Sequence, residues 1–113
     1  MNLQDIRKAV PVEVLTGIER LNEEVTGGYV SDLLSNVMGQ AQTGNIWVTM
    51  QGHQNIIAVA SLLGLAGIVL AGGVKPDEET IRKAEKESIV LMVTNLSAFE
   101  VSGKLYNLGL TGQ

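Results

Sequence analysis

The segment IWVTMQGHQNIIAVASLLGLAGIVLA, residues 46–71, decides the fold of this chain. It reads as a strand at 46–50, a helix at 55–63 that stops at Gly64, and a second strand at 66–71. The second strand is apolar throughout, as expected of a strand covered on both faces, and glycine suits the left-handed residue that follows many helices. A strand, a helix and another strand in succession predict a crossover unit of a parallel sheet.

The chain continues in the same manner toward its C-terminus. Pro76 and Asp77 are expected to open a helix whose acidic residues come first and basic residues last, an order that complements the helix dipole. A third strand is predicted at 89–94. Residues 97–100, Ser-Ala-Phe-Glu, form a capping box for a last helix. The buried stripe of that helix is predicted to contain Ala98, Val101, Leu105 and Leu108.

Before residue 46 the pattern is less regular. A short amphipathic helix is expected at 2–10 and strands at 12–15 and 24–29. A further helix is predicted at 30–41, because apolar residues recur there at i, i+3, i+4, i+7, i+8 and i+11. Ser31 or Asp32 is its expected cap. Together these elements predict one compact α/β domain, residues 1–113, with a mainly parallel sheet and flanking helices in two or three layers.

Composition restricts the function. Twelve acidic and eight basic residues give a net charge of −4, whereas a protein that binds nucleic acid normally carries a basic face. There is no cysteine, which excludes disulfides and thiolate metal sites and suits a cytoplasmic location. The first ten residues lack the apolar core of a signal peptide.

The middle of the chain is uncharged: no Asp, Glu, Lys or Arg occurs at 33–74. Within it, residues 56–74 approach the length of a membrane span, but four glycines interrupt them, which favours a buried helix and strand. With 45% hydrophobic residues, a mean hydropathy of +0.21 and 113 residues, the chain is predicted to expose surplus apolar surface in this neutral segment. A homodimer would cover that surface.

Ligands of parallel α/β sheets bind where strands end and helices begin. The strand-to-helix loops here are 51–54, 72–76 and 94–97, and 26–28 precedes an earlier helix. Unpaired amides at helix N-termini favour a phosphate or carboxylate. The alternative interpretation is that the glycines in these loops only make tight turns. The candidate ligand-binding residues are Thr26, Gly27, Gly28, Gly52, His53, Gln54, Asn55, Gly72, Gly73, Lys75 and Thr94.

No catalytic or metal site is predicted, and no cofactor. His53 is the only histidine, and its spacing offers neither a nucleophile nor the further ligands that zinc requires. Gly103 and Lys104 do not form a phosphate-binding loop, because Ala98 and Leu105 occupy the positions of the first glycine and the final hydroxyl. An enzyme that uses the His53 loop stays open as an alternative.

Three short motifs resemble the DRTGG domain family, most clearly over residues 25–110. They are residues 26–32, residues 52–55, and residues 71–73 with 75–77. In place of the Asp-Arg and Thr-Gly-Gly elements that give the family its name, this chain has His53-Gln54 and Ala71-Gly72-Gly73. The family is also similar to the N-terminal domain of HPr kinase/phosphorylase, whose kinase chemistry lies in a separate C-terminal domain.

The resemblance implies a non-catalytic regulatory or interaction module. DRTGG domains occur beside CBS domains in regulated pyrophosphatases and within long phosphotransacetylases, and stand-alone members are associated with hydrogenase gene clusters. The expected partners are therefore a second copy of the chain, a small anionic ligand or nucleotide, and a protein of a hydrogenase system. A purely structural dimerisation domain remains the alternative to a ligand sensor.

Overall fold

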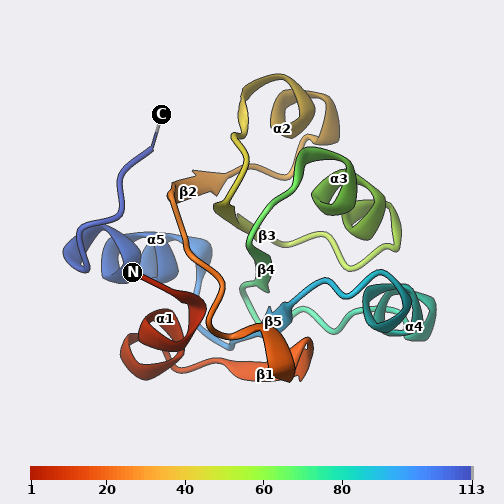
Figure 1. Ribbon diagram of the computed structural model, residues 1–113, viewed down its shortest axis with the longest axis horizontal. Helices are drawn as coiled ribbons and strands as arrows, with labels where there is room; N and C mark the ends of the chain where they lie inside the picture. The colour runs from red at the N-terminus through yellow and green to blue at the C-terminus, as the bar shows by residue number, and fades with distance from the viewer. Residues whose placement is uncertain (113) are drawn as a thin grey trace.

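Five strands form one sheet with helices on both faces in the computed structural model, which describes residues 1–112 (Figure 1). The helices are α1 (Leu3–Ala9), α2 (Leu34–Gln40), α3 (Asn55–Leu63), α4 (Glu78–Lys86) and α5 (Ala98–Asn107), with a 3-10 turn η1 (Ile18–Arg20). The strands are β1 (Glu13–Thr16), β2 (Gly27–Val30), β3 (Asn45–Thr49), β4 (Gly67–Leu70) and β5 (Leu91–Val93). The predicted α/β class is confirmed.

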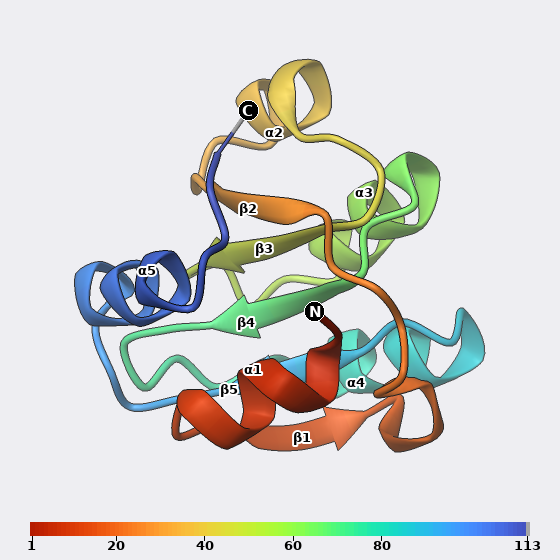
Figure 2. The same ribbon diagram turned by 60° about the vertical axis from the view of Figure 1, so that its left-hand side comes forward.

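The sheet has the order β1-β5-β4-β3-β2. Strands β2 to β5 are parallel, and β1 pairs antiparallel with β5 at one edge. Because the strands advance in one direction through right-handed crossovers, α2, α3 and α4 all lie on the same face. Helices α1 and α5 cover the opposite face (Figures 1 and 2). The domain therefore has three layers.

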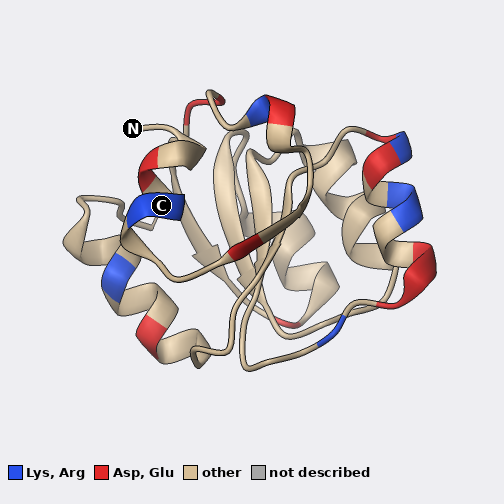
Figure 3. Ribbon diagram, turned by 90° about the horizontal axis from the view of Figure 1, so that it is seen from below, with Lys and Arg blue, Asp and Glu red and all other residues tan. Residues whose placement is uncertain are grey.

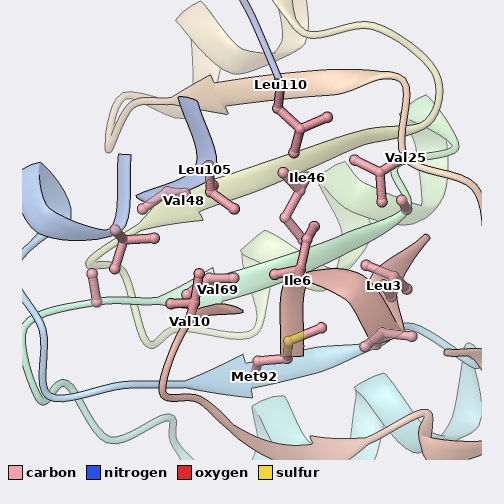
Figure 4. Packing of buried hydrophobic residues seen from close by; sticks show 14 of the residues in the cluster. Leu3, Ile6, Val10, Val25, Ile46, Val48, Val69, Met92, Leu105 and Leu110 are labelled. Carbon is pink, nitrogen blue, oxygen red and sulfur yellow. The ribbon is translucent and has the colours of Figure 1, made fainter. Parts of the chain in front are cut away.

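The alternation of side chains along β3 divides the core in two. Ile46 and Val48 face α1 and α5, whereas Trp47 faces α2 and α3. Figure 4 shows the first cluster, in which Leu3 and Ile6 of α1 pack toward these strand residues. All five side chains are fully buried.

Several helix boundaries follow the predicted signals. Gly64 ends α3 with a left-handed φ of 67°. At α5, the hydroxyl of Ser97 accepts a hydrogen bond of 3.2 Å from the amide of Glu100, so the Ser97 half of the predicted capping box is present. Helix α4 has acidic residues in its first turn and basic residues in its last, and Figure 3 shows how charge gathers on this helix.

The helix predicted at 30–41 begins late. Val30 belongs to β2 and pairs with Val48 of β3, so α2 starts only at Leu34. The strand predicted at 24–29 is likewise displaced, because both Gly27 and Gly28 lie inside β2. Pairing with β3 outweighs the local preference of two glycines against strand structure.

Neither predicted cap of that helix acts as one. The carboxylate of Asp32 accepts hydrogen bonds from the hydroxyl of Thr49, at 2.8 Å, and from the amide of Met50, at 2.7 Å. The hydroxyl of Ser31 accepts from the amide of Leu33, at 3.1 Å, before the helix begins. Asp32 therefore ties the end of β2 to the end of β3.

The neutral segment does not form a membrane span. Within residues 1–112 no helix has the length and apolar character needed to cross a bilayer. Residues 56–74 instead contribute most of α3 and all of β4. Helix α3 buries Ile56, Ile57, Val59 and Ala60, but Leu62 is exposed, so the chain itself does not enclose this helix on both sides as its composition suggested.

Candidate ligand-binding site

The loops that follow the parallel strands meet at the carboxyl ends of those strands. The chain enters α3, α4 and α5 from this end of the sheet after β3, β4 and β5. Because β1 runs in the opposite direction, its beginning at Pro11 to Glu13 also lies here. The structure thus brings together the predicted residues of the three loops and adds the start of β1 to them.

Gly52 is needed for contact between two of these loops. Its carbonyl accepts hydrogen bonds from the hydroxyl of Thr80, at 2.7 Å, and from the amide of Asp77, at 3.1 Å. A Cβ at Gly52 would lie 2.9 Å from the carbonyl oxygen of Lys75, closer than packing permits. The glycine therefore lets the β3–α3 loop lie against the start of α4.

Gly72 and Gly73 shape the β4–α4 loop rather than offering free amides. Both have left-handed backbones, with φ of 74° and 73°. The amide of Gly72 donates to the carbonyl of Leu96 at 2.7 Å, and the amide of Gly73 donates to the carbonyl of Thr94 at 3.0 Å. Both amides are therefore engaged within the chain and are not offered to an anion, although Gly73 still lines the site described below.

A substitution at Gly73 tests this structural role. Gly73→Ala is expected to lower the free energy of unfolding by about 1–2 kcal/mol, because a side chain disfavours the left-handed backbone. Gly39→Ala is the matched control, since Gly39 lies exposed in α2 with nothing within 4 Å of its added Cβ. The control should stabilise the protein by about 0.5–1 kcal/mol. Urea denaturation measures both, and equal effects of the two changes would contradict the assignment.

Thr94 holds β1 in place. Its hydroxyl donates to the carbonyl of Pro11 at 2.8 Å and accepts from the amide of Leu96 at 3.2 Å. At the other end of β1, the hydroxyl of Thr16 donates to the carbonyl of Ile89 at 2.7 Å. Thr94 therefore supports the wall of the site through its contacts within the chain.

The predicted residues Thr26, Gly27 and Gly28 do not join the other loops. They stand at the beginning of β2, whereas the loops gather where the parallel strands end. At that opposite end of the strands, the hydroxyl of Thr26 donates a hydrogen bond to the carbonyl of Thr43 at 2.9 Å. Residues 26–28 therefore lie apart from the other three loops, because β2 starts three residues later than its apolar pattern suggested.

His53 lies in the β3–α3 loop with an exposed side chain. Its Nδ1 accepts a hydrogen bond of 3.1 Å from the amide of Asn55, so the ring caps the first turn of α3. Gln54 occupies the N-cap position but its side chain makes no capping bond. These three predicted residues are not part of the lining of the cavity described next.

A cavity of about 620 Å³ opens between β1, β5 and the beginning of α4. This volume is in the range of small-molecule sites, about 300–1,000 Å³. Figure 1 places the three elements together at the lower side of the sheet. The cavity is lined by Pro11, Val12, Glu13, Leu15, Gly73, Val74, Lys75, Pro76, Ile81, Val93, Thr94 and Asn95.

The lining is mainly apolar, with a few polar groups. Leu15, Ile81 and Val93 come from β1, α4 and β5 and form part of the core under α4. Lys75 supplies a cation and Asn95 an amide from the two adjoining loops, and Glu13 supplies a carboxylate from the start of β1. Such a surface suits a ligand that has both a flat apolar part and an anionic part.

Nine lining residues are absent from the predicted set: Pro11, Val12, Glu13, Leu15, Val74, Pro76, Ile81, Val93 and Asn95. The first four of these belong to the site because β1 is antiparallel and begins at the side of the sheet where the parallel strands end. No sequence signal marks this direction, since β1 and β2 are joined by a long segment and occupy opposite edges of the sheet.

The DRTGG domain family model matches residues 5–108. The chain belongs to the DRTGG domain family. The match covers the resemblance predicted at 25–110 except its last two residues. It also includes most of α1 and all of β1. A comparison with curated protein sequences finds no match.

The fold of this DRTGG domain has a solved counterpart. It is the crystal structure of the CBS and DRTGG domains of the regulatory region of Clostridium perfringens pyrophosphatase, complexed with its activator, diadenosine tetraphosphate. The match has a TM-score of 0.74 at 20% sequence identity and covers 92% of this chain. It covers 45% of the other chain, so the present chain spans less than half of that regulatory region. The similarity shows a shared fold.

Proposed function

We propose that this DRTGG domain is a non-catalytic regulatory module that binds a nucleotide in the cavity between β1, β5 and α4. The observation that carries the proposal is a mainly apolar cavity of about 620 Å³ with Lys75 among its lining residues. The apolar wall suits a nucleobase, and a lysine suits its phosphates. The pyrophosphatase region with the same fold binds diadenosine tetraphosphate as an activator, which supports a nucleotide over a simple anion.

The non-catalytic part of the proposal rests on what the polar residues do. Thr94 is engaged with Pro11 and Leu96, and His53 with Asn55. These side chains position the backbone and are not free to react with a ligand. A bound ligand would therefore change the stability or assembly of the domain and would itself stay unchanged. His53→Ala should consequently leave nucleotide binding intact.

A thermal-shift panel tests the ligand class. ATP, AMP, diadenosine tetraphosphate, pyrophosphate and inorganic phosphate are each added to the protein. A nucleotide at 100 times its Kd should add about 2.7 kcal/mol of stability and raise Tm by about 10 °C. Stabilisation by phosphate alone would replace the nucleotide with a simple anion, and no stabilisation by any member would favour a purely structural domain.

Lys75→Glu locates the site. Reversing the charge should weaken ATP binding by about 10- to 100-fold, because a charge-assisted contact of roughly 1.5–3 kcal/mol is lost. Lys86→Glu makes the same change in net charge at the far end of α4, outside the cavity lining, and should bind ATP normally. Equal affinities of the two variants would place the nucleotide elsewhere.

The proposal extends to assembly and location. Nine large hydrophobic side chains are exposed among the described residues, which supports a homodimer. A cytoplasmic protein of a hydrogenase system is the proposed context, as the family resemblance implies. Affinity isolation of the tagged protein from cells grown with and without an active hydrogenase would test that context.

A further inference from the structure

Glu13 is a charged residue of the cavity lining that lies among apolar neighbours. Along β1, Leu15 packs under α4, whereas Val12 and Val14 pack against the core on the side of α1 and α5. Because side chains alternate between the two faces of a strand, Glu13 projects to the same face as Leu15. Its partner across the strands is Val93 of β5, which also packs under α4. The side chain of Glu13 therefore stands beside the apolar wall of the cavity.

The sheet fixes the position of Glu13. This residue pairs directly with Val93 in the antiparallel register of β1 and β5. Two residues earlier, the carbonyl of Pro11 accepts a hydrogen bond of 2.8 Å from the hydroxyl of Thr94. Figure 2 shows β1 lying along β5 at the edge of the sheet. A polar group carried by a rigid strand is well suited to selecting one ligand over another.

Glu13 and Lys75 give the cavity opposite charges at separate places. Glu13 lies at the start of β1, and Lys75 lies in the β4–α4 loop. The ion pairs within residues 1–112 involve neither of them, so these two charges do not neutralise one another by direct contact. Phosphates are attracted toward Lys75 and repelled by Glu13. A ligand with a hydrogen-bond donor at one end and an anionic group at the other matches this arrangement.

The chemistry of a carboxylate limits what Glu13 recognises. An ionised carboxylate only accepts hydrogen bonds. The exocyclic amino groups of nucleobases are donors, and carboxylate side chains accept from such groups in base recognition, whereas a base carbonyl is itself an acceptor. The group that matches Glu13 is therefore an amino group on the base.

We propose that Glu13 determines the specificity of the cavity by accepting a hydrogen bond from the exocyclic amino group of the base, while the phosphates lie toward Lys75. The inference rests on the proposed function, nucleotide binding in this cavity, and specifies which nucleotides bind. They are those whose base carries an amino group. Nucleotides that lack this group bind more weakly, because the carboxylate then faces no donor.

The alternative role of Glu13 is protection of the sheet edge. Strand β1 is an edge strand, and a charged side chain on an edge strand discourages pairing with another chain. That role makes no distinction between two ligands that differ only in an amino group. Selectivity between such ligands is therefore the property that separates the two roles.

Matched pairs of nucleotides test the inference. ATP is compared with purine riboside triphosphate, and GTP with ITP, since the second member of each pair lacks the amino group of the first and keeps the triphosphate. In isothermal titration, the unmodified protein should bind the amino-bearing member of at least one pair about 10-fold more tightly, because a hydrogen bond to a charged group is lost with the other member. The pair that shows the preference identifies the base that Glu13 contacts.

Glu13→Gln should reduce that preference to about 3-fold or less, because the glutamine amide donates to ring nitrogens as well as accepting from an amino group. Both members of a pair carry the same triphosphate, so the ratio of their affinities does not depend on repulsion between the carboxylate and the phosphates. Glu19→Gln is the matched control. It removes the same charge from η1, outside the cavity lining, and should keep the preference of about 10-fold.

The outcomes separate this inference from the proposed function. Equal affinities within both pairs, or a preference that Glu13→Gln leaves unchanged, would overturn the role of Glu13 while nucleotide binding stands. Tighter binding of both members of a pair by Glu13→Gln, at an unchanged ratio, would mean that the carboxylate only repels phosphates. Failure of all four nucleotides to bind the unmodified protein would overturn the proposed function and this inference together. Circular dichroism verifies that each variant is folded.

Discussion

Replacing Trp47 by alanine is expected to lower the free energy of unfolding by about 3–5 kcal/mol, a large share of the ~5–15 kcal/mol typical of a domain. Trp47 is fully buried in β3, where it packs with Ile56, Ile57 and Val37 beneath α2 and α3. Its removal leaves a cavity that the interior of a three-layer domain cannot close by relaxation. Its indole Nε1 also donates to the carbonyl of Ser31 at 2.9 Å, which would lose its partner.

Trp47→Phe separates these contributions. It keeps most of the volume but removes the indole N–H, so its cost should be about 1–2 kcal/mol. Because Trp47 is the only tryptophan, unfolding is followed by circular dichroism in urea. Equal losses for the alanine and phenylalanine variants would mean that the hydrogen bond to Ser31, and not packing, dominates at this position.

Val93→Phe is expected to weaken ATP binding at least about 100-fold, or about 3 kcal/mol. Val93 ends β5 and forms part of the cavity wall. A phenyl ring there would occupy space that the nucleobase needs, and a packed sheet does not shift easily to make room. The added volume should itself cost about 1–3 kcal/mol of stability, so folding is verified first.

The control places the same ring elsewhere. Leu62→Phe adds a ring on the exposed side of α3, away from the residues that line the cavity. Its affinity for ATP should match that of the unmodified protein in equilibrium dialysis. Normal ATP binding by a folded Val93→Phe variant would exclude the cavity as the nucleotide site.

The parallel part of the fold was predictable because its signals are local. Strands β3, β4 and β5 and helices α3, α4 and α5 appear close to their predicted positions. Apolar runs, a glycine at the end of a helix and acidic residues in a first turn each determine structure over only a few neighbouring residues. The predictions that failed are the strand at 24–29 and the helix at 30–41. There the tertiary contacts of Val30 and Asp32 override the helical pattern.

The lining of the candidate cavity was predictable in part. The rule that ligands bind beyond the ends of parallel strands led to Gly73, Lys75 and Thr94, which do line the cavity. Two features could not be read from sequence. The direction of β1 depends on long-range pairing, and Gly27 and Gly28 resemble loop glycines until pairing with β3 places them in a strand.

The central claim is that the domain binds a nucleotide without converting it. Isothermal titration of the unmodified protein with ATP, followed by chromatography of the nucleotide after long incubation, tests this most directly. The account predicts saturable binding at one site per chain and recovery of ATP unchanged. Absence of binding, or ATP converted at a rate that His53→Ala abolishes, would contradict it.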